Sequence, residues 1–219
     1  MDLFEAIRNR RSIRRFEDKP VPEDLVKKII EAGQWAPSAC NRQEWKFIII
    51  DSKEVKERIL KDTTAYFVGK TPLLILVVYS NRTDNLEYKD HLLTAAMAIQ
   101  NMQLAAYSLG LGSCCVNNLP IKSRLRKILN IPRHYDPVSL LCIGFPKAFP
   151  KPLKRKEKLD EIICKNSFSF KDDSPAIDIK LNVKRLVRYV YYRAPASIKK
   201  VLDPLARKFE KKFDHDEPS

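Results

Sequence analysis

The sequence lacks the features that mark several common classes of protein. Its five cysteines form no Cys-x-x-Cys pair and are odd in number, so neither a zinc site nor a disulfide framework is indicated. We expect them to be reduced thiols, mostly in the core. Its three histidines are scattered, and no Ser-His-Asp triad or metal cluster is required. The longest apolar runs are too short to span a bilayer, and acidic residues stand where a signal peptide would be cationic. A cytoplasmic protein is therefore expected.

Acidic residues are also scarce relative to basic ones. There are 41 Lys and Arg against 27 Asp and Glu, which gives a formal net charge of +14. Such a balance could serve a phosphate-bearing partner. However, residues 178–212 hold eleven Lys or Arg and only three acids, so much of the excess lies near the C-terminus. The sequence carries no zinc finger, RNP aromatics or KH loop, and we expect no nucleic acid as a partner.

Length and periodicity predict one main domain of mixed secondary structure. With 219 residues, 44% of them hydrophobic and 31% charged, the chain can bury a substantial core. Helical spacing predicts helices over 2–9, 25–32, 53–61 and 91–109, the last of them central and buried. β-rich apolar runs predict strands over 45–51, 73–79 and 138–143. This order predicts an α+β fold rather than a regular βαβ alternation.

Two short segments carry the most specific signal for function. The first is RRSIRR at residues 10–15, whose guanidinium groups and hydroxyl could clamp a dianionic phosphate through charge-assisted hydrogen bonds. Taken alone, such a basic run is usually solvated surface. The second segment is APSACNRQEW at residues 36–45. Together the two segments indicate a site for a phosphate-bearing flavin.

These segments resemble the FMN-dependent nitroreductase family, whose patterns are Arg-Arg-Ser-x-Arg and Pro-Ser-x-x-Asn-x-Gln-Pro-Trp. Residues 93–115 are similar to the family's central helix and the loop that follows it, and CIGFP at 142–146 is similar to its last core strand. The resemblance covers about residues 1–165. It implies a nitroreductase-like α+β fold, with a central, mainly antiparallel sheet flanked by helices, in a dimeric protein.

The resemblance also implies roles for residues of the first segment. It places Arg10, Ser12 and Arg14 at the FMN phosphate and ribityl chain. Arg14 is able to approach the N1/O2 edge of the flavin ring. A fixed positive charge there would stabilise the reduced ring, which carries negative charge near N1.

Further basic residues have weaker roles by the same resemblance. Arg11 would add backbone or ribityl contacts, whereas Arg15 is expected to face solvent. Arg155 matches the family's late phosphate-binding arginine. Lys154 and Lys156 are the alternatives if the register slips by one residue.

In the second segment, Pro37, Ser38, Ala39 and Asn41 would form a loop that crosses to the FMN of the other subunit. The alternative is a simple turn between a helix and a strand. Glu44 departs from the family pattern, which generally has proline there. It adds an acid close to a site expected to receive an anionic cofactor.

Residues 112–118 would supply backbone to one face of the flavin, where an amide can hydrogen-bond N5. Asn117 and Asn118 are the candidates, because a donor at N5 helps to stabilise developing charge. The adjacent Cys114 and Cys115 could suggest redox chemistry. Neighbouring cysteines rarely form a strain-free disulfide, so packing is favoured.

In such a family the chemistry belongs to the cofactor. NADH or NADPH reduces FMN and leaves, and a small organic acceptor such as a nitroaromatic or a quinone then takes the electrons in a ping-pong cycle. The resemblance therefore implies an FMN-dependent NAD(P)H oxidoreductase. It also implies a homodimer with FMN at the subunit interface.

The tail needs a separate account. We assign residues 1–165 to the FMN-binding domain and 166–219 to a basic amphipathic C-terminal extension, with a linker at 172–175 and amphipathic segments at 183–192 and 196–213. Three interpretations stay open: an arm packed on this or the neighbouring subunit, peripheral contact with an anionic membrane, and docking to an acidic partner. The alternative function is a basic binding protein that retains the fold and acts through this tail.

Overall fold

The structure is a computed structural model that describes residues 2–63, 65–151, 154–170, 178–195, 197–199 and 201–202. It divides into two units, the first ending at residue 150 and the second beginning at residue 151. The domain boundary expected at residue 165 stays a prediction. No described helix is long and apolar enough to cross a membrane.

The first unit contains four strands and five α-helices in its described part. The helices are α1 (Leu3–Asn9), α2 (Glu23–Gln34), α3 (Lys53–Leu60), α4 (Asp90–Ser108) and α5 (Lys122–Leu129). The strands are β1 (Trp45–Ile50), β2 (Leu73–Ser80), β3 (Gly112–Val116) and β4 (Tyr135–Gly144), and short 3-10 helices are η1 (Ala39–Asn41) and η2 (Tyr66–Lys70). The second unit contains η3 (Leu159–Ile162) and α6 (Ile179–Arg193).

The strands form one antiparallel sheet in the order β1-β2-β4-β3. Every residue of β2 is buried, because this central strand is covered on both faces of the sheet. Its unbroken apolar run is the pattern expected of such a strand. The α+β class and the mainly antiparallel sheet predicted from the sequence are confirmed.

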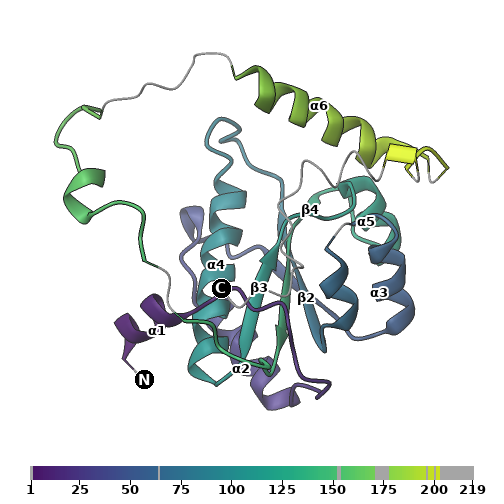
Figure 1. The fold of residues 1–219 in the computed structure, drawn as a ribbon, viewed down its shortest axis with the longest axis horizontal. Coiled ribbons are helices and arrows are strands. Elements are labelled where there is room, and N and C mark those ends of the chain that lie inside the picture. The colour runs from purple at the N-terminus through teal and green to yellow at the C-terminus, as the bar shows by residue number, and fades with distance from the viewer. Residues whose placement is uncertain are drawn as a thin grey trace. The chain divides into compact units, whose positions relative to one another are not determined.

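Helices cover both faces of this sheet (Figure 1): α2 and α4 lie on one side, and α3 and α5 lie on the other. Alternate residues of β2 therefore enter two separate cores. Ile75 and Val77 pack in the core that includes Met102 of α4. Leu74 and Leu76 pack in the core that includes Ile59 of α3 and Leu125 of α5.

The close approach of α2 to α4 depends on a glycine. A Cβ atom on Gly33 would lie 2.8 Å from Cγ of Met102, so a larger residue would push the two helices apart. Residues of α4 that face the sheet are small, notably Ala95, Ala98 and Ala106, and all three are buried. One face of α4 is therefore buried, whereas Leu93 and Met97 on another face are exposed, so the helix is not buried all round, in contrast to the prediction from its composition.

Two elements differ from the prediction. Residues 112–116, expected in a loop, form the edge strand β3, which pairs along its whole length with β4. Helix α5 was not predicted. The sequence GSCCV contains a single β-branched residue, and its strand structure comes from pairing with β4 rather than from local preference.

The described part of the tail is helical. Helix α6 contains the predicted segment 183–192, and residues 197–199 and 201–202 are helical as well. The predicted linker at 172–175 and the remainder of the segment 196–213 lie outside the described residues.

A buried carboxylate joins α5 to β4. Asp136 accepts hydrogen bonds from Lys122, Arg126 and Asn81, and Nε2 of His91 lies 3.9 Å from its Oδ2. Burial alone would raise the pKa of Asp136. The hydrogen bonds from Lys122 and Asn81 and the charges of Lys122 and Arg126 outweigh burial and lower the pKa below its usual value.

We predict that Asp136→Asn lowers the free energy of unfolding at pH 7 by about 2 kcal/mol, since two cations lose their carboxylate partner. The pKa of Asp136 is lower in the folded state than in the unfolded state. Its stabilisation is therefore present above the unfolded pKa and is lost as pH falls through the folded pKa. Urea unfolding should show the difference between the two proteins shrinking below about pH 4.

The exposed Asp84 provides the control, because Asp84→Asn should change stability by less than about 0.5 kcal/mol. A difference between wild type and Asp136→Asn that stays constant from pH 7 to pH 3 would contradict the role given to this carboxylate.

Candidate functional site

The basic segment at residues 10–15 lies along the outer edge of β3. Ser12 forms a parallel bridge with Ser113, and the backbone N–H of Ile13 donates to the carbonyl of Ser113 at 2.9 Å. Ile13 is buried, and a Cβ atom on Gly112 would lie 2.8 Å from its Cγ1. The glycine thus lets the segment approach the strand closely.

Anchoring Ile13 fixes its neighbours. Ser12 and Arg14 stay beside the core that Ile13 enters, because Cys114 and Phe67, which they approach, pack in or against the same core. Ser12 is exposed, and Arg14 is half-buried. The guanidinium carbon of Arg14 lies 5.9 Å from the ring centroid of Phe67 in η2.

The surroundings of the Cys114 thiol, in the middle of β3, include three predicted residues. Burial raises the pKa of Cys114, while the positive charges of Arg14 and Arg10 and a hydrogen bond from the Ser12 side chain act to lower it. Arg10, Ser12 and Arg14 therefore all act on the same thiol.

Two atoms in the basic segment and β3 have unused hydrogen-bonding capacity. Among the described residues, Nη1 of Arg10 and Oγ of Ser113 are buried and have no hydrogen-bond partner. Leaving a buried polar group unpaired costs about 1–3 kcal/mol, and more when the group is charged. An unpaired guanidinium N–H and an unpaired hydroxyl are both donors that a phosphate group could satisfy. The residues present thus fit a phosphate-bearing ligand.

The second predicted segment forms a tight loop between α2 and β1. Cys40, Asn41 and Gln43 all have positive φ, at 49°, 54° and 53°, which is unusual for residues other than glycine. The loop holds this shape through its own side chains. Ser38 Oγ accepts from the Gln43 backbone N–H at 3.1 Å, and Asn41 Oδ1 accepts from Gln43 Nε2 at 2.6 Å.

A hydrogen bond ties this loop to the central helix. The backbone N–H of Ala39 donates to Oγ1 of Thr94 in α4 at 3.3 Å, and Thr94 is buried. Pro37, Ser38, Ala39 and Asn41 are therefore anchored on α4, whereas the basic segment is anchored on β3.

Glu44, which replaces the family's proline, is neutralised within the loop. Its carboxylate accepts from Nε of Arg42 at 2.9 Å, and Arg42 also donates to the carbonyl of Arg82. The backbone N–H of Glu44 donates to the hydroxyl of Tyr79 at 3.3 Å, a bond that proline could not form. The added acid is thus paired with a base of the same loop.

Asn117 and Asn118 directly follow β3. Asn117 is exposed, and the backbone carbonyl of Asn118 accepts a hydrogen bond from Oγ1 of Thr63. That hydroxyl also accepts from the Ala65 N–H at 3.2 Å. The region leading into η2 is therefore joined to the end of β3.

Sequence reasoning missed the contribution of η2. Phe67 lies under Arg14, and Tyr66 of the same short helix is partly exposed. Tyr66 and Phe67 are adjacent aromatic residues, which is the signal that the sequence offers, but no sequence pattern places them beside the arginines.

Arg11 is half-buried in the first unit. Arg155 is exposed in the second unit, and its role in binding phosphate stays a prediction.

The cysteines are free thiols, but fewer of them are buried than expected. Cys114 and Cys142 are buried, Cys115 and Cys164 are half-buried, and Cys40 is exposed. Burial raises the pKa of the Cys142 thiol strongly, since a thiolate would be desolvated there. Sγ of Cys115 lies 2.9 Å from Oγ of Ser139. Cys114 and Cys142 are therefore packing residues.

We predict that iodoacetamide at pH 8 modifies Cys40 in the native protein and leaves Cys114 and Cys142 unmodified. The reason is that the thiolate is the reactive species, and burial suppresses it at the latter two residues. Peptide mass mapping would measure this, with urea-unfolded protein as the control in which all five react. Modification of Cys142 as fast as Cys40 would exclude the buried, protonated state.

Comparison with known proteins identifies the family of this fold and site. The model of the nitroreductase family matches residues 7–70 and 60–145. A protein of Methanothermobacter thermautotrophicus, whose name refers to NADH dehydrogenase and NAD(P)H nitroreductase, is 35% identical over 158 residues, which is 68% of this chain and 80% of that protein.

Solved structures agree. An FMN-dependent nitroreductase from Clostridium difficile has a TM-score of 0.66 at 26% identity, over 75% of this chain and 99% of that one. A nitroreductase structure from Desulfovibrio desulfuricans, in complex with FMN, has a TM-score of 0.66 at 29% identity, over 77% and 99% of the two chains. The chain belongs to the nitroreductase family. This confirms the resemblance seen in its motifs and the assignment to nitroreductase-type enzymes.

Proposed function

We propose that this protein is an FMN-dependent oxidoreductase that takes hydride from NADH or NADPH and passes electrons to a small organic acceptor such as a nitroaromatic or a quinone. The observation that carries the proposal is the buried, unpartnered Nη1 of Arg10 beside Ser12 and Arg14. The names of the relatives support it, because two of the similar structures are described with FMN and the archaeal relative with NAD(P)H.

In this proposal the basic segment holds the phosphate end of FMN. Arg10 and Ser12 bind the phosphate, and Arg11 contributes to the ribityl chain. A phosphate-binding role for Arg155 rests on the family motif alone. Arg14, held against the Phe67 ring, contributes its charge at the N1/O2 edge. A fixed cation there favours the reduced cofactor, because it is in place before negative charge develops.

We assign the residues that directly follow β3 to the edge of the flavin ring that carries N5. Asn117 and Asn118 stand where backbone groups can meet N5, and the bond between Thr63 and the Asn118 carbonyl limits the movement of this segment. When bound, FMN supplies the hydride chemistry, with donor and acceptor visiting the site in turn. The protein's own residues bind, orient and provide charge.

The exposed face of α4 supports a homodimer. Leu93 and Met97 are 53% and 45% exposed, and Leu104 and Tyr107 on the same face are half-buried. From residue 92 to residue 108 the helix carries no Lys, Arg, Asp or Glu. A surface helix with an apolar outer face is expected to be covered by another protein surface.

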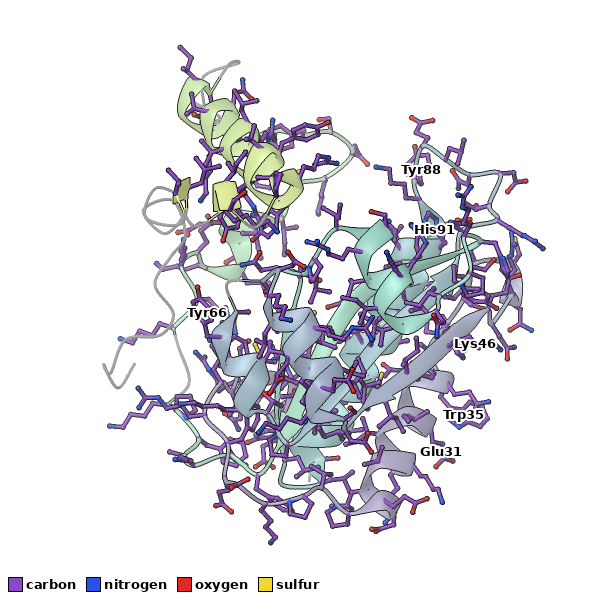
Figure 2. All side chains as sticks on the ribbon, turned by 90° about the vertical axis from the view of Figure 1, so that its right-hand side faces the viewer. Glu31, Trp35, Lys46, Tyr66, Tyr88 and His91 are labelled. Atoms are coloured by element: carbon purple, nitrogen blue, oxygen red, sulfur yellow. The ribbon has the colours of Figure 1, made fainter. Side chains whose placement is uncertain are left out.

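The loop at residues 37–41 is attached to the same helix, since Ala39 is bonded to Thr94 of α4. Just before the loop, Trp35 is 80% exposed, and Figure 2 shows its side chain projecting away from the sheet near Glu31. Exposed tryptophans are typical anchors of protein interfaces. We infer that Pro37, Ser38, Ala39 and Asn41 reach the FMN site of the partner subunit across this interface.

We predict that Arg10→Ala and Arg14→Ala each weaken FMN binding by roughly tenfold to a hundredfold, the loss of about 1.5–3 kcal/mol for a charge-assisted contact. Arg15→Ala, in an exposed residue of the same segment, is the matched control. Fluorescence titration of the apoprotein measures the dissociation constants. Equal constants in all three variants would refute the assignment.

The thermal stability of the apoprotein separates binding from folding. Arg10 Nη1 has no partner to lose within the described residues, so Arg10→Ala should leave the melting temperature of the apoprotein unchanged or raise it. A large loss of apoprotein stability would instead show that Arg10 holds the fold.

For the interface, we predict that Met97→Glu weakens dimerisation at least tenfold and reduces FMN retention, because burying an unpaired carboxylate is costly. Multi-angle light scattering over a dilution series measures the first effect. Lys53→Glu in α3, which covers the opposite face of the sheet, is the control and should remain dimeric. A wild-type protein that is monomeric, flavin-loaded and active would contradict the shared site.

A further inference from the structure

Helix α6 of the second unit carries an apolar stripe with no described partner along its outer face. Ile179, Val183, Leu186 and Val190 follow one another at helical spacings of four, three and four residues, so they share one face. Their exposed fractions lie between 46% and 73%. Beyond the end of α6, Ile198 and Val201 are exposed apolar residues as well.

Cationic side chains flank this stripe. On an ideal helix Arg193 and Arg185 lie to one side of it and Lys184 to the other, with Arg188 opposite. The acid in this helical region is Asp178, whose side chain accepts from the Leu181 N–H at 2.8 Å and caps the helix. From residue 178 to residue 202 the sequence has seven Lys or Arg and one acid, a net charge of +6.

Two tyrosines pack against cations, and one of them, Tyr189, borders the apolar stripe. The guanidinium carbon of Arg193 lies 3.7 Å from the ring centroid of Tyr189, and that of Arg188 lies 5.8 Å from the ring of Tyr192. Tyr189 is itself exposed beside the stripe. Amphipathic rings of this kind favour the boundary between water and an apolar phase.

We propose that α6 docks in the plane of an anionic lipid surface, with the stripe in the acyl boundary and the arginines at the headgroups. The charge of this segment is complementary to anionic lipid, and the apolar stripe runs the whole length of the helix between cations. A strip of this length suits a flat, extended surface better than a compact pocket. The proposal does not depend on FMN chemistry, so the two can fail separately.

The test uses the full-length, FMN-saturated protein and sedimentation with vesicles. Vesicles of phosphatidylglycerol and phosphatidylcholine should bind the protein at low salt, whereas pure phosphatidylcholine vesicles should bind it weakly. Raising the salt concentration should weaken binding to the anionic vesicles, because headgroup attraction is screened. Absence of binding to anionic vesicles at low salt would overturn the proposal.

Two serine variants distinguish binding through the apolar stripe from non-specific hydrophobic binding. Leu186→Ser removes the central residue of the stripe and should weaken vesicle binding about tenfold. Leu181→Ser, in an exposed leucine on the other side of α6, is the matched control and should bind as wild type does. Circular dichroism and the flavin spectrum establish that both variants are folded.

Polyglutamate in solution distinguishes a lipid surface from an acidic protein partner. We expect polyglutamate to bind the protein weakly and in a salt-sensitive way, and we expect Leu186→Ser to leave this affinity unchanged. If polyglutamate binds as tightly as the vesicles, and Leu186→Ser leaves both affinities unchanged, the surface is a purely electrostatic one for an acidic partner and the membrane proposal is wrong.

Discussion

The candidate site depends on the attachment of one extended segment to the edge of a sheet. Ile13 is held by its bond to the Ser113 carbonyl and by the space that Gly112 leaves for its side chain. This attachment holds the polar residues on either side of Ile13 beside Cys114 and Phe67. Without it the arginines would be a flexible basic run, whose ordering on a ligand would cost conformational entropy.

The same sheet supports the rest of the arrangement. Its central strand is buried on both faces, so the helices on either side are fixed relative to one rigid layer. One of these helices, α4, has a core-facing side of alanines and an outer side free of charge, and it holds the loop that follows α2 through Thr94. The packing that stabilises the fold and the surface that would meet a second subunit thus belong to one element.

Much of this could be predicted from the sequence where the signal is local. The apolar run of β2 and the alanine-rich sequence of α4 predict their secondary structure without any knowledge of tertiary contacts. The strand β3 could not be predicted in the same way, because Gly112, Ser113 and Cys114 have little strand preference and owe their conformation to pairing with β4. The arginine motif indicated the ligand class, but the contact between Arg14 and Phe67 joins residues far apart in the chain, which no local pattern reveals.

The backbone strain of the loop with three left-handed residues is compensated when the protein folds, not when the loop binds. Each such conformation disfavours a residue other than glycine by on the order of 1 kcal/mol. Hydrogen bonds from Gln43 to Ser38 and Asn41 hold the shape before anything binds. The unfavourable backbone energy is therefore compensated during folding. A protein surface that bound this loop would contact a preformed conformation. Fast, rigid docking is favoured over slow adjustment after contact.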